Sequence, residues 1–338
     1  MFSVVIPLFQ KRAYIRRTLD SVLAQTIGRE AVPEIIVVND GSTDGGDAVA
    51  RERADPRIRV IDQPNRGVSA ARNAGIAAAG QPYVAFLDAD DRWRPPFLER
   101  MRDLVARYPG AVLYGSGFTT VRGDVPEGDH GVRPAELLGG GVASRGTVAG
   151  PVDFFRAWRR DHVVHPSGMI VPREAALAIG GFRDGLAHCE DHLFLAMLGL
   201  AGAVVLTAEP LVDYDVAVPG QFIDYWRGPY RERFDVLEYH RFLAAELRRR
   251  AGSAADRSFV AYARGQLRTA VMQRLYWGNF AAVDRLWREL DLAQMGLGGA
   301  ATVAAWLARR RGVQPLAALG LRAVRGLRAA ARTETRAA

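Results

Sequence analysis

Short β-rich runs and helical patterns alternate through the first hundred residues, and no other feature of the sequence constrains the fold as strongly. Strands are predicted at residues 3–7, 34–38, 59–62 and 83–87, and helices at residues 14–24, 44–53, 68–79 and 95–108. Such alternation is typical of an α/β fold, in which helices cover both faces of a mostly parallel sheet. Ligands of these sheets bind at the carboxyl ends of the strands.

The pattern changes after residue 110. Residues 115–150 are rich in Gly and Val and carry few helix signals, which predicts a strand and a variable loop with a flexible point at residues 139–141. Further on, the sequence predicts a helix, a strand at residues 167–171, a helix at residues 173–179 and a helix from Asp191. Beyond Ile223 nearly everything predicts amphipathic helix, with a turn at residues 277–279.

These patterns divide the chain near Gly220. We expect an α/β domain over residues 1–220, whose first half covers residues 1–110 and whose second half covers residues 111–220. A helical C-terminal region is expected over residues 221–338. The uncharged apolar run from Leu193 to Ala208 is shorter than the ~20 residues of a spanning helix, so it predicts a buried helix followed by a strand.

The fourth predicted strand ends in three carboxylates within four residues, Asp88, Asp90 and Asp91. Carboxylates this close repel one another, so the arrangement is costly unless a divalent cation or a cationic ligand offsets the charge. The alternative is a solvated acidic turn. Polar segments also follow the first strand (Pro7–Gln10) and the second strand (Asn39–Asp44), and we expect all three to converge on one edge of the sheet.

The positive charge of the chain is concentrated at its C-terminal end. The formal net charge is +8, and eight arginines and one glutamate after Asp291 account for +7 of it, which leaves +1 for the rest. A nearly neutral body argues against a broad phosphate-binding face, so no nucleic-acid partner is expected. Cys189 is the only cysteine and the chain starts directly in a strand without a basic leader, so we expect a reducing, cytoplasmic location.

Several ordered motifs together resemble glycosyltransferase family 2. They occupy residues 3–7 (SVVIP), 19–26 (LDSVLAQT), 34–44 (EIIVVNDGSTD), 67–75 (GVSAARNAG) and 88–90 (DAD), and the resemblance covers roughly residues 1–215. It implies a GT-A fold with a Rossmann-like, mostly parallel sheet, here followed by a C-terminal helical extension. It further implies an inverting enzyme that uses a nucleoside-diphosphate sugar, most often a UDP-sugar, together with Mn²⁺ or Mg²⁺.

The resemblance assigns a nucleotide-binding role to residues that follow the first two strands. Asp40 would accept a hydrogen bond from the imide of a uracil-like base, and its alternative role is to form a turn. Pro7 and Phe9 would form the wall beside the base, although the family more often has Tyr and Asn at the positions of Phe9 and Gln10. Phe9 could instead serve packing alone. Arg72 could meet a phosphate or hold the loop by a salt bridge.

The segment Asp88-Ala89-Asp90 corresponds to the family's nucleotide-sugar and metal motif. By resemblance, Asp88 reaches the ribose or the metal, and Asp90 coordinates the Mn²⁺ or Mg²⁺ that bridges the diphosphate. A divalent cation stabilises a departing nucleoside diphosphate as its negative charge grows. Asp91 is interpreted either as a residue that contacts the metal ligands without binding the ion itself, or as a carboxylate at the start of a helix.

The segment from His188 to His192 resembles the acidic pair on the acceptor side of the family. Asp191 would be the general base that takes the proton of the acceptor hydroxyl, and it could also cap the following helix. Glu190 and His165 would bind the acceptor. Four histidines in this half fit no common zinc spacing, so a zinc site is not expected; they are His162, His165, His188 and His192.

Two departures from the family pattern bear on the substrate. Residues 213–218 (DYDVAV) stand where the family often has an Arg and His motif on a loop that closes over the diphosphate. The Gln-Arg-Trp signature of processive synthases is missing, so we expect single-sugar addition to a saccharide or a lipid-linked saccharide. In the tail, leucines and arginines segregate to opposite sides of a predicted helix around residues 316–332, which predicts peripheral membrane contact or, alternatively, a solvated or frayed helix.

Three other functions stay open at this point. A nucleotidyltransferase would carry a Gly-rich phosphate loop after the first strand, and Pro7–Gln10 is not one. A catalytically silent nucleotide-sugar binding module conflicts with the complete set of Asp88, Asp90 and Asp191. A haloacid-dehalogenase-like phosphatase would have its nucleophilic Asp after the first strand, where this chain has none.

Overall fold

The computed structural model describes residues 1–133, 142–144, 147–159, 162–186, 189–218, 237–276 and 280–297. The chain divides into two compact units, Met1–Gly228 and Pro229–Ala338, whereas the predicted boundary lies near residue 220. Several predicted features fall outside the described residues. They are the flexible point at residues 139–141, His188, the turn at residues 277–279 and the basic tail helix beyond residue 300.

The N-terminal half of the first unit is the α/β arrangement that the sequence predicts. Its four strands are parallel and lie in the order β3, β2, β1, β4; they are β1 (Phe2–Leu8), β2 (Glu34–Asp40), β3 (Ile58–Gln63) and β4 (Tyr83–Phe86). The helices between and after them are α1 (Arg12–Leu23), α2 (Gly46–Arg51), α3 (Val68–Ala78) and α4 (Phe97–Arg107). Every residue of β1 is buried, as expected for a central parallel strand.

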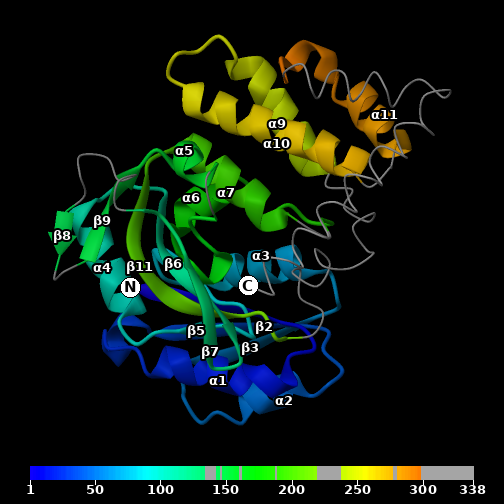
Figure 1. Ribbon diagram of the computed structural model, residues 1–338. Helices are drawn as coiled ribbons and strands as arrows, with labels where there is room; N and C mark the ends of the chain where they lie inside the picture. The colour runs from blue at the N-terminus through cyan, green and yellow to red at the C-terminus, as the bar shows by residue number, and fades with distance from the viewer. Residues whose placement is uncertain are drawn as a thin grey trace, which may run out of the picture. The chain divides into compact units, whose positions relative to one another are not determined.

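Helices cover both faces of this sheet. Val4 and Ile6 of β1 share a core cluster with Ile15 of α1 and Phe97 of α4. Figure 1 shows α1 and α2 on one side of the strands and α3 on the other. Successive side chains of a strand point to opposite faces, so Val5 meets α3 instead. This double cover leaves the carboxyl ends of the strands as the open edge for ligands.

Gly75 brings α3 unusually close to β1, which leads to a prediction about stability. A Cβ at Gly75 would overlap Cγ1 of Val5, so Gly75→Ala should lower the unfolding free energy by about 1–3 kcal/mol through overpacking. Gly265 in α10 (Arg257–Tyr276) is the matched control, because a Cβ there meets nothing within 4 Å. Gly265→Ala should instead stabilise its unit by about 0.5–1 kcal/mol. Thermal unfolding distinguishes the two, and equal effects would contradict the close approach.

The second half of this unit extends the sheet beyond β4 with mixed strand directions. β10 (Met169–Pro172) runs antiparallel to β4, and β6 (Leu113–Arg122) follows it. β11 (Val204–Asp215) lies parallel to β6 and antiparallel to β9 (Thr147–Val152). β8 (Val142–Ser144) completes this edge.

Residues 115–150 hold more strands than the sequence indicates. Besides β6, β8 and β9, the chain forms β7 (Val125–His130), which pairs antiparallel with β6 through a turn at Gly123 with φ +64°. Val125–Asp129 are all exposed, so β7 has no buried face to produce an alternating apolar pattern. A further short strand, β5 (Arg92–Trp93), pairs with β11.

The described part of the first unit also contains the helices α5 (Phe154–Trp158), α6 (Arg173–Ala178) and α7 (Glu190–Ala201) and the 3₁₀ turns Arg29–Ala31 and Pro166–Gly168. The apolar run from Leu193 to Ala208 is a buried helix followed by a strand, as predicted. In the second unit the described elements are α9 (Leu237–Arg250), α10, α11 (Phe280–Glu289) and the short 3₁₀ turn Leu292–Met295. Among the described helices, none combines the length and the apolar character needed to cross a membrane.

Candidate active site

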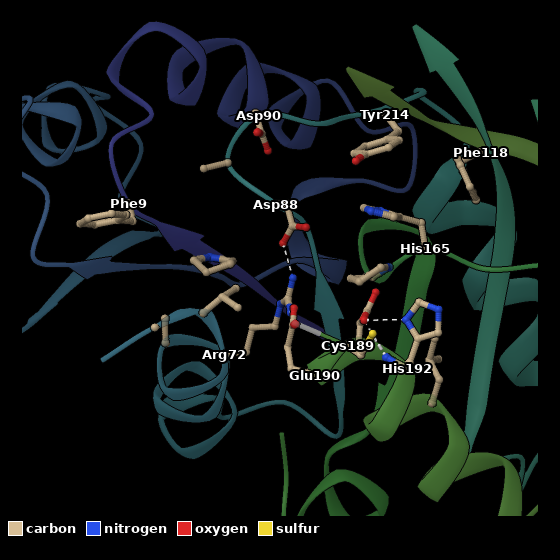
Figure 2. Close-up of a pocket in the computed structure, with 18 of the residues that line it drawn as sticks. Phe9, Arg72, Asp88, Asp90, Phe118, His165, Cys189, Glu190, His192 and Tyr214 are labelled. Carbon is tan, nitrogen blue, oxygen red and sulfur yellow. Dashed lines mark hydrogen bonds and ion pairs between the residues drawn. The ribbon is translucent and has the colours of Figure 1, made fainter. Parts of the chain in front are cut away.

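A cavity of about 700 Å³ opens at the carboxyl ends of β1, β2 and β4 and reaches the start of α7. Side chains from both halves of the first unit line it, as Figure 2 shows for the labelled residues. All ten residues that the sequence singles out lie on its wall: Pro7, Phe9, Asp40, Arg72, Asp88, Ala89, Asp90, His165, Glu190 and Asp191. The expected convergence on one edge is therefore confirmed, while the individual roles stay predictions.

Asp40 ends β2 and anchors the loop that leads into α3. Its Oδ1 accepts hydrogen bonds from Nε2 of Gln63 (2.7 Å) and the amide of Arg66 (2.9 Å), and its Oδ2 accepts one from the amide of Gly67 (2.8 Å). The side chain is buried yet reaches the cavity wall. Asp40 therefore does more than form a turn, and its contact with a base stays a prediction.

Phe9 projects at the opening of the cavity. It directly follows β1 and is 44 % exposed, whereas every residue of that strand is buried. Phe9 is thus only partly covered by the protein, and its two predicted roles, contact with a base and packing, both stay predictions. An exposed ring beside a polar pocket suits contact with a planar ligand.

Asp91 is the most deeply buried of the three acidic residues after β4. Its Oδ2 accepts a hydrogen bond from Oγ of Ser167 (2.5 Å), while its Oδ1 has no hydrogen-bond partner. Burial, followed by the charges of Asp90 and Asp88, raises the pKa of Asp91 well above its usual range. The interpretation of Asp91 as a helix-start carboxylate is wrong, because β5 follows it directly and α4 begins at Phe97.

A candidate metal centre combines one predicted ligand with two that the prediction lacks. Asp88, Asp91 and His165 offer ligand atoms that lie within 4.8 Å of one another. Asp90, the other predicted ligand, has its Oδ2 2.8 Å from Nζ of Lys11. Carboxylate oxygens and one imidazole suit Mn²⁺ or a similar hard divalent cation. The unpartnered Oδ1 of buried Asp91 fits such an ion, because a cation would offset an otherwise costly buried oxygen.

Arg72 joins the two acidic groups of the cavity. Its Nη2 donates to Oδ1 of Asp88 (2.8 Å) and its Nη1 donates to Oε1 of Glu190 (3.0 Å). The guanidinium also lies over the ring of Phe182, 5.1 Å from its centroid. Figure 2 shows Arg72 between Asp88 and Glu190. Of the two predicted roles for Arg72, the salt bridge is observed.

Glu190 and Asp191 form the first turn of α7, where the helix dipole favours negative charge. Cys189, with φ +59°, is the N-cap residue, so the interpretation of Asp191 as the cap is wrong. Oδ1 of Asp191 accepts hydrogen bonds from the amide (2.7 Å) and Nδ1 (2.9 Å) of His192.

The pKa values of the two adjacent carboxyl groups at the start of α7 are shifted in opposite directions. Burial alone would raise the pKa of Asp191, but His192 and Arg72 outweigh burial and hold it well below its usual range. Burial and the charge of Asp191 raise the pKa of Glu190, against the opposing effect of Arg72. Such a split between two carboxyl groups is a common basis for assigning acid and base roles, and it makes Asp191 the ionised group.

An aromatic wall forms another part of the cavity lining; it is made of Phe118 (β6), His130 (β7), His165 and Tyr214 (β11). Phe118 stacks on His130 with centroids 4.9 Å apart, and His165 lies 4.6 Å from Tyr214. Burial raises the pKa of Tyr214, so its hydroxyl stays neutral. Apart from His165, sequence reasoning missed these residues, because nothing in the local pattern of β7 or the end of β11 points to a ligand.

Comparison with protein families gives a match to one family model, described as Glycosyl transferase family 2, over residues 3–163. The chain is 35 % identical over 119 residues to the glycosyltransferase GlyA of Streptococcus pneumoniae, which covers 35 % of this chain and 17 % of that protein. It is 39 % identical over 105 residues to the uncharacterized glycosyltransferase EpsJ of Bacillus subtilis, over 30 % of each. It is 33 % identical over 153 residues to the putative teichuronic acid biosynthesis glycosyltransferase TuaG of Bacillus subtilis, over 44 % of this chain and 59 % of that one.

The chain thus spans less than two thirds of the length of each of these relatives. Among solved structures, residues 1–349 of TarS from S. aureus, in complex with UDP-GlcNAc, superpose with a TM-score of 0.66. That match covers 95 % of this chain and 87 % of the other at 17 % identity, so it shows the shared fold alone.

Proposed function

Because residues 3–163 belong to glycosyl transferase family 2, we propose that the protein transfers one sugar from a nucleoside-diphosphate sugar to an acceptor hydroxyl, with inversion at the anomeric carbon. One observation carries the proposal: the acidic residues after β4 and the ionised Asp191 face the same cavity, where Arg72 joins Asp88 to Glu190, the neighbour of Asp191. The UDP-GlcNAc in the TarS structure supports a UDP-sugar donor. The name of TuaG supports a role in cell-surface polymer synthesis.

The donor would occupy the side of the cavity formed by the strand ends. Pro7 and Phe9 would flank the base and Asp40 would contact it, with the diphosphate near Asp88, Ala89 and Asp90. The acidic groups after β4, with His165, would hold Mn²⁺ or Mg²⁺. Such an ion, when bound, supplies Lewis-acid stabilisation of the leaving diphosphate.

Asp191 would act on the acceptor. Its carboxylate takes the proton of the acceptor hydroxyl while that oxygen forms a bond to the anomeric carbon. On the opposite face of the sugar, the bond to the diphosphate oxygen breaks and its electron pair leaves with the diphosphate. Glu190 and the aromatic wall, which includes His165, would orient a saccharide acceptor, because aromatic rings offer flat apolar faces to a sugar.

A panel of nucleoside-diphosphate sugars tests the proposal by thermal shift and donor hydrolysis, with Mn²⁺, Mg²⁺ or chelator. One donor should stabilise the wild type in the presence of the metal, by about 2.7 kcal/mol at a concentration of 100 Kd. Asp90→Ala should abolish that shift, because the mutation removes a carboxylate from the cavity wall. Asp124→Ala is the matched control, since Asp124 is 87 % exposed in the turn before β7 and should leave the shift intact.

Two outcomes of this panel would lead away from a transferase. Donor binding with neither hydrolysis nor transfer would favour the catalytically silent binding module. A lack of response to every donor under every metal condition would reject a nucleotide-sugar site altogether. The membrane contact of the basic tail and a cytoplasmic location stay predictions, and the tail lies outside the described residues.

A further inference from the structure

The imidazole of His192, which hydrogen-bonds Asp191, is held by contacts on three sides. The ring stacks on Trp158 of α5, with centroids 5.4 Å apart and an angle of 29° between the rings. His162 meets it edge to face, with centroids 5.3 Å apart. The third contact is the 2.9 Å hydrogen bond from Nδ1 to Oδ1 of Asp191. A ring clamped in this way has little freedom to turn away from the carboxylate.

We propose that His192 is a positioning residue for the base: it holds Oδ1 of Asp191 by a charge-assisted hydrogen bond and so leaves the other carboxylate oxygen to the acceptor hydroxyl. This inference rests on the proposed transferase function and adds a residue to that site. Trp158, His162 and His192 all line the cavity, so the clamp lies within the site itself. Figure 2 shows His192 at the start of α7, beside Cys189 and Glu190.

The charges around Asp191 and His192 determine whether loss of the His192 side chain raises or lowers the pKa of Asp191. Asp191 is faced by His192 and Glu190 on α7 and by Arg72 on α3, and its charge also acts on His165 and Cys189. Burial would lower the pKa of His192, but Asp191 and Glu190 outweigh it and raise the pKa, which favours the cationic form of the ring. Without that side chain, Arg72, the backbone amide of residue 192 and the helix start still oppose burial, but the largest opposing effect is lost and the pKa of Asp191 rises.

The test is the pH dependence of donor hydrolysis or transfer in the wild type, His192→Phe and His192→Asn. Phe keeps a ring against Trp158 but loses the hydrogen-bond donor, while Asn keeps a donor but loses the charge. We expect His192→Phe to lower kcat by about tenfold or more and to move the acidic limb of the kcat profile to higher pH by about one unit. For His192→Asn, both kcat and the position of the acidic limb should lie between those of the wild type and those of His192→Phe. The Kd for UDP with Mn²⁺ should stay within about twofold in all three, which also shows that the variants fold.

A histidine outside the cavity serves as the control. His240 of α9 is also buried but does not line the cavity, so His240→Phe should leave both kcat and the acidic limb unchanged. A His192→Phe enzyme with a wild-type limb and a wild-type kcat would overturn the inference. Failure of the wild type to bind any nucleoside diphosphate would instead count against the proposed function, so the two failures are distinguishable.

A measurement without any substrate tests the same contact. The chain has six histidines, so their ring protons can be followed individually by NMR through a pH titration. Asp191→Asn should lower the pKa of His192, because it removes the charge that holds the proton. An unchanged His192 titration in Asp191→Asn would show that the pair does not interact, and the inference would be wrong.

Discussion

Asp191→Asn should reduce sugar transfer by about 10²–10⁴-fold, because an amide has nearly the same shape as a carboxylate but cannot take a proton. The pKa of Asp191 lies well below its usual range, so the wild-type group is ionised and able to act as a base throughout the neutral range. Donor binding should remain, since the nucleotide side of the cavity is built from other residues. The rate at which nucleoside diphosphate is released gives kcat, and calorimetry gives the Kd of the nucleoside diphosphate.

Glu174→Gln is the matched control for this variant. Glu174 also lies in the first turn of a helix, α6, but it does not line the cavity. Loss of its charge should leave transfer within about twofold of the wild type, since surface substitutions of this kind are nearly neutral. If Asp191→Asn retained a tenth or more of the wild-type kcat, Asp191 would not be the base.

Arg72→Met should lower the free energy of unfolding by about 3–5 kcal/mol, the largest stability effect we expect from a single substitution in this site. The Arg72 side chain is 3 % exposed and pairs with two carboxylates, which would be left in a buried setting without a cation. Urea denaturation measures the change. Arg72→Lys should not restore the loss, because one ammonium cannot reproduce the two branches of the guanidinium.

Arg66→Met provides the comparison. Arg66 pairs with Asp184 at 3.3 Å, but the two side chains are 63 % and 50 % exposed, so the same substitution should cost at most about 1 kcal/mol. Equal losses of unfolding free energy in Arg66→Met and Arg72→Met would mean that burial of the Arg72 salt bridges does not make their loss more costly. A large loss at Arg72 alone would show that the contact between the donor side and the acceptor side is also a structural one.

The sequence predicts the parallel half of the fold well for a physical reason. Strands that are buried on both faces must be almost continuously apolar, as β1 is, and the carboxyl ends of such strands must collect the polar groups. This logic identified Asp40 and Asp88 and placed them on one edge. It depends only on local composition and on the geometry of parallel sheets.

The rest of the site depends on contacts that no local pattern records. Asp88, Asp90 and Asp91 look alike in the sequence, but the deeply buried Asp91 accepts a hydrogen bond from Ser167, which lies 76 residues further along the chain. The sequence does not predict β7, because the segment that pairs with β6 is exposed and so lacks an alternating apolar pattern. His192 directly follows the predicted base, but its clamp consists of side chains from a different helix and loop.

The position of β11 has a consequence for how the protein is made. β11 is the last strand along the described part of its unit, yet it lies inside the sheet, between β6 and β9, and also pairs with β5 just after the acidic segment. A growing chain on the ribosome can form the four parallel strands early, as N-terminal regions fold first during synthesis. The acidic segment receives its final support only after Asp215 has left the exit tunnel, so a nascent chain that stops earlier carries the catalytic residues without the site.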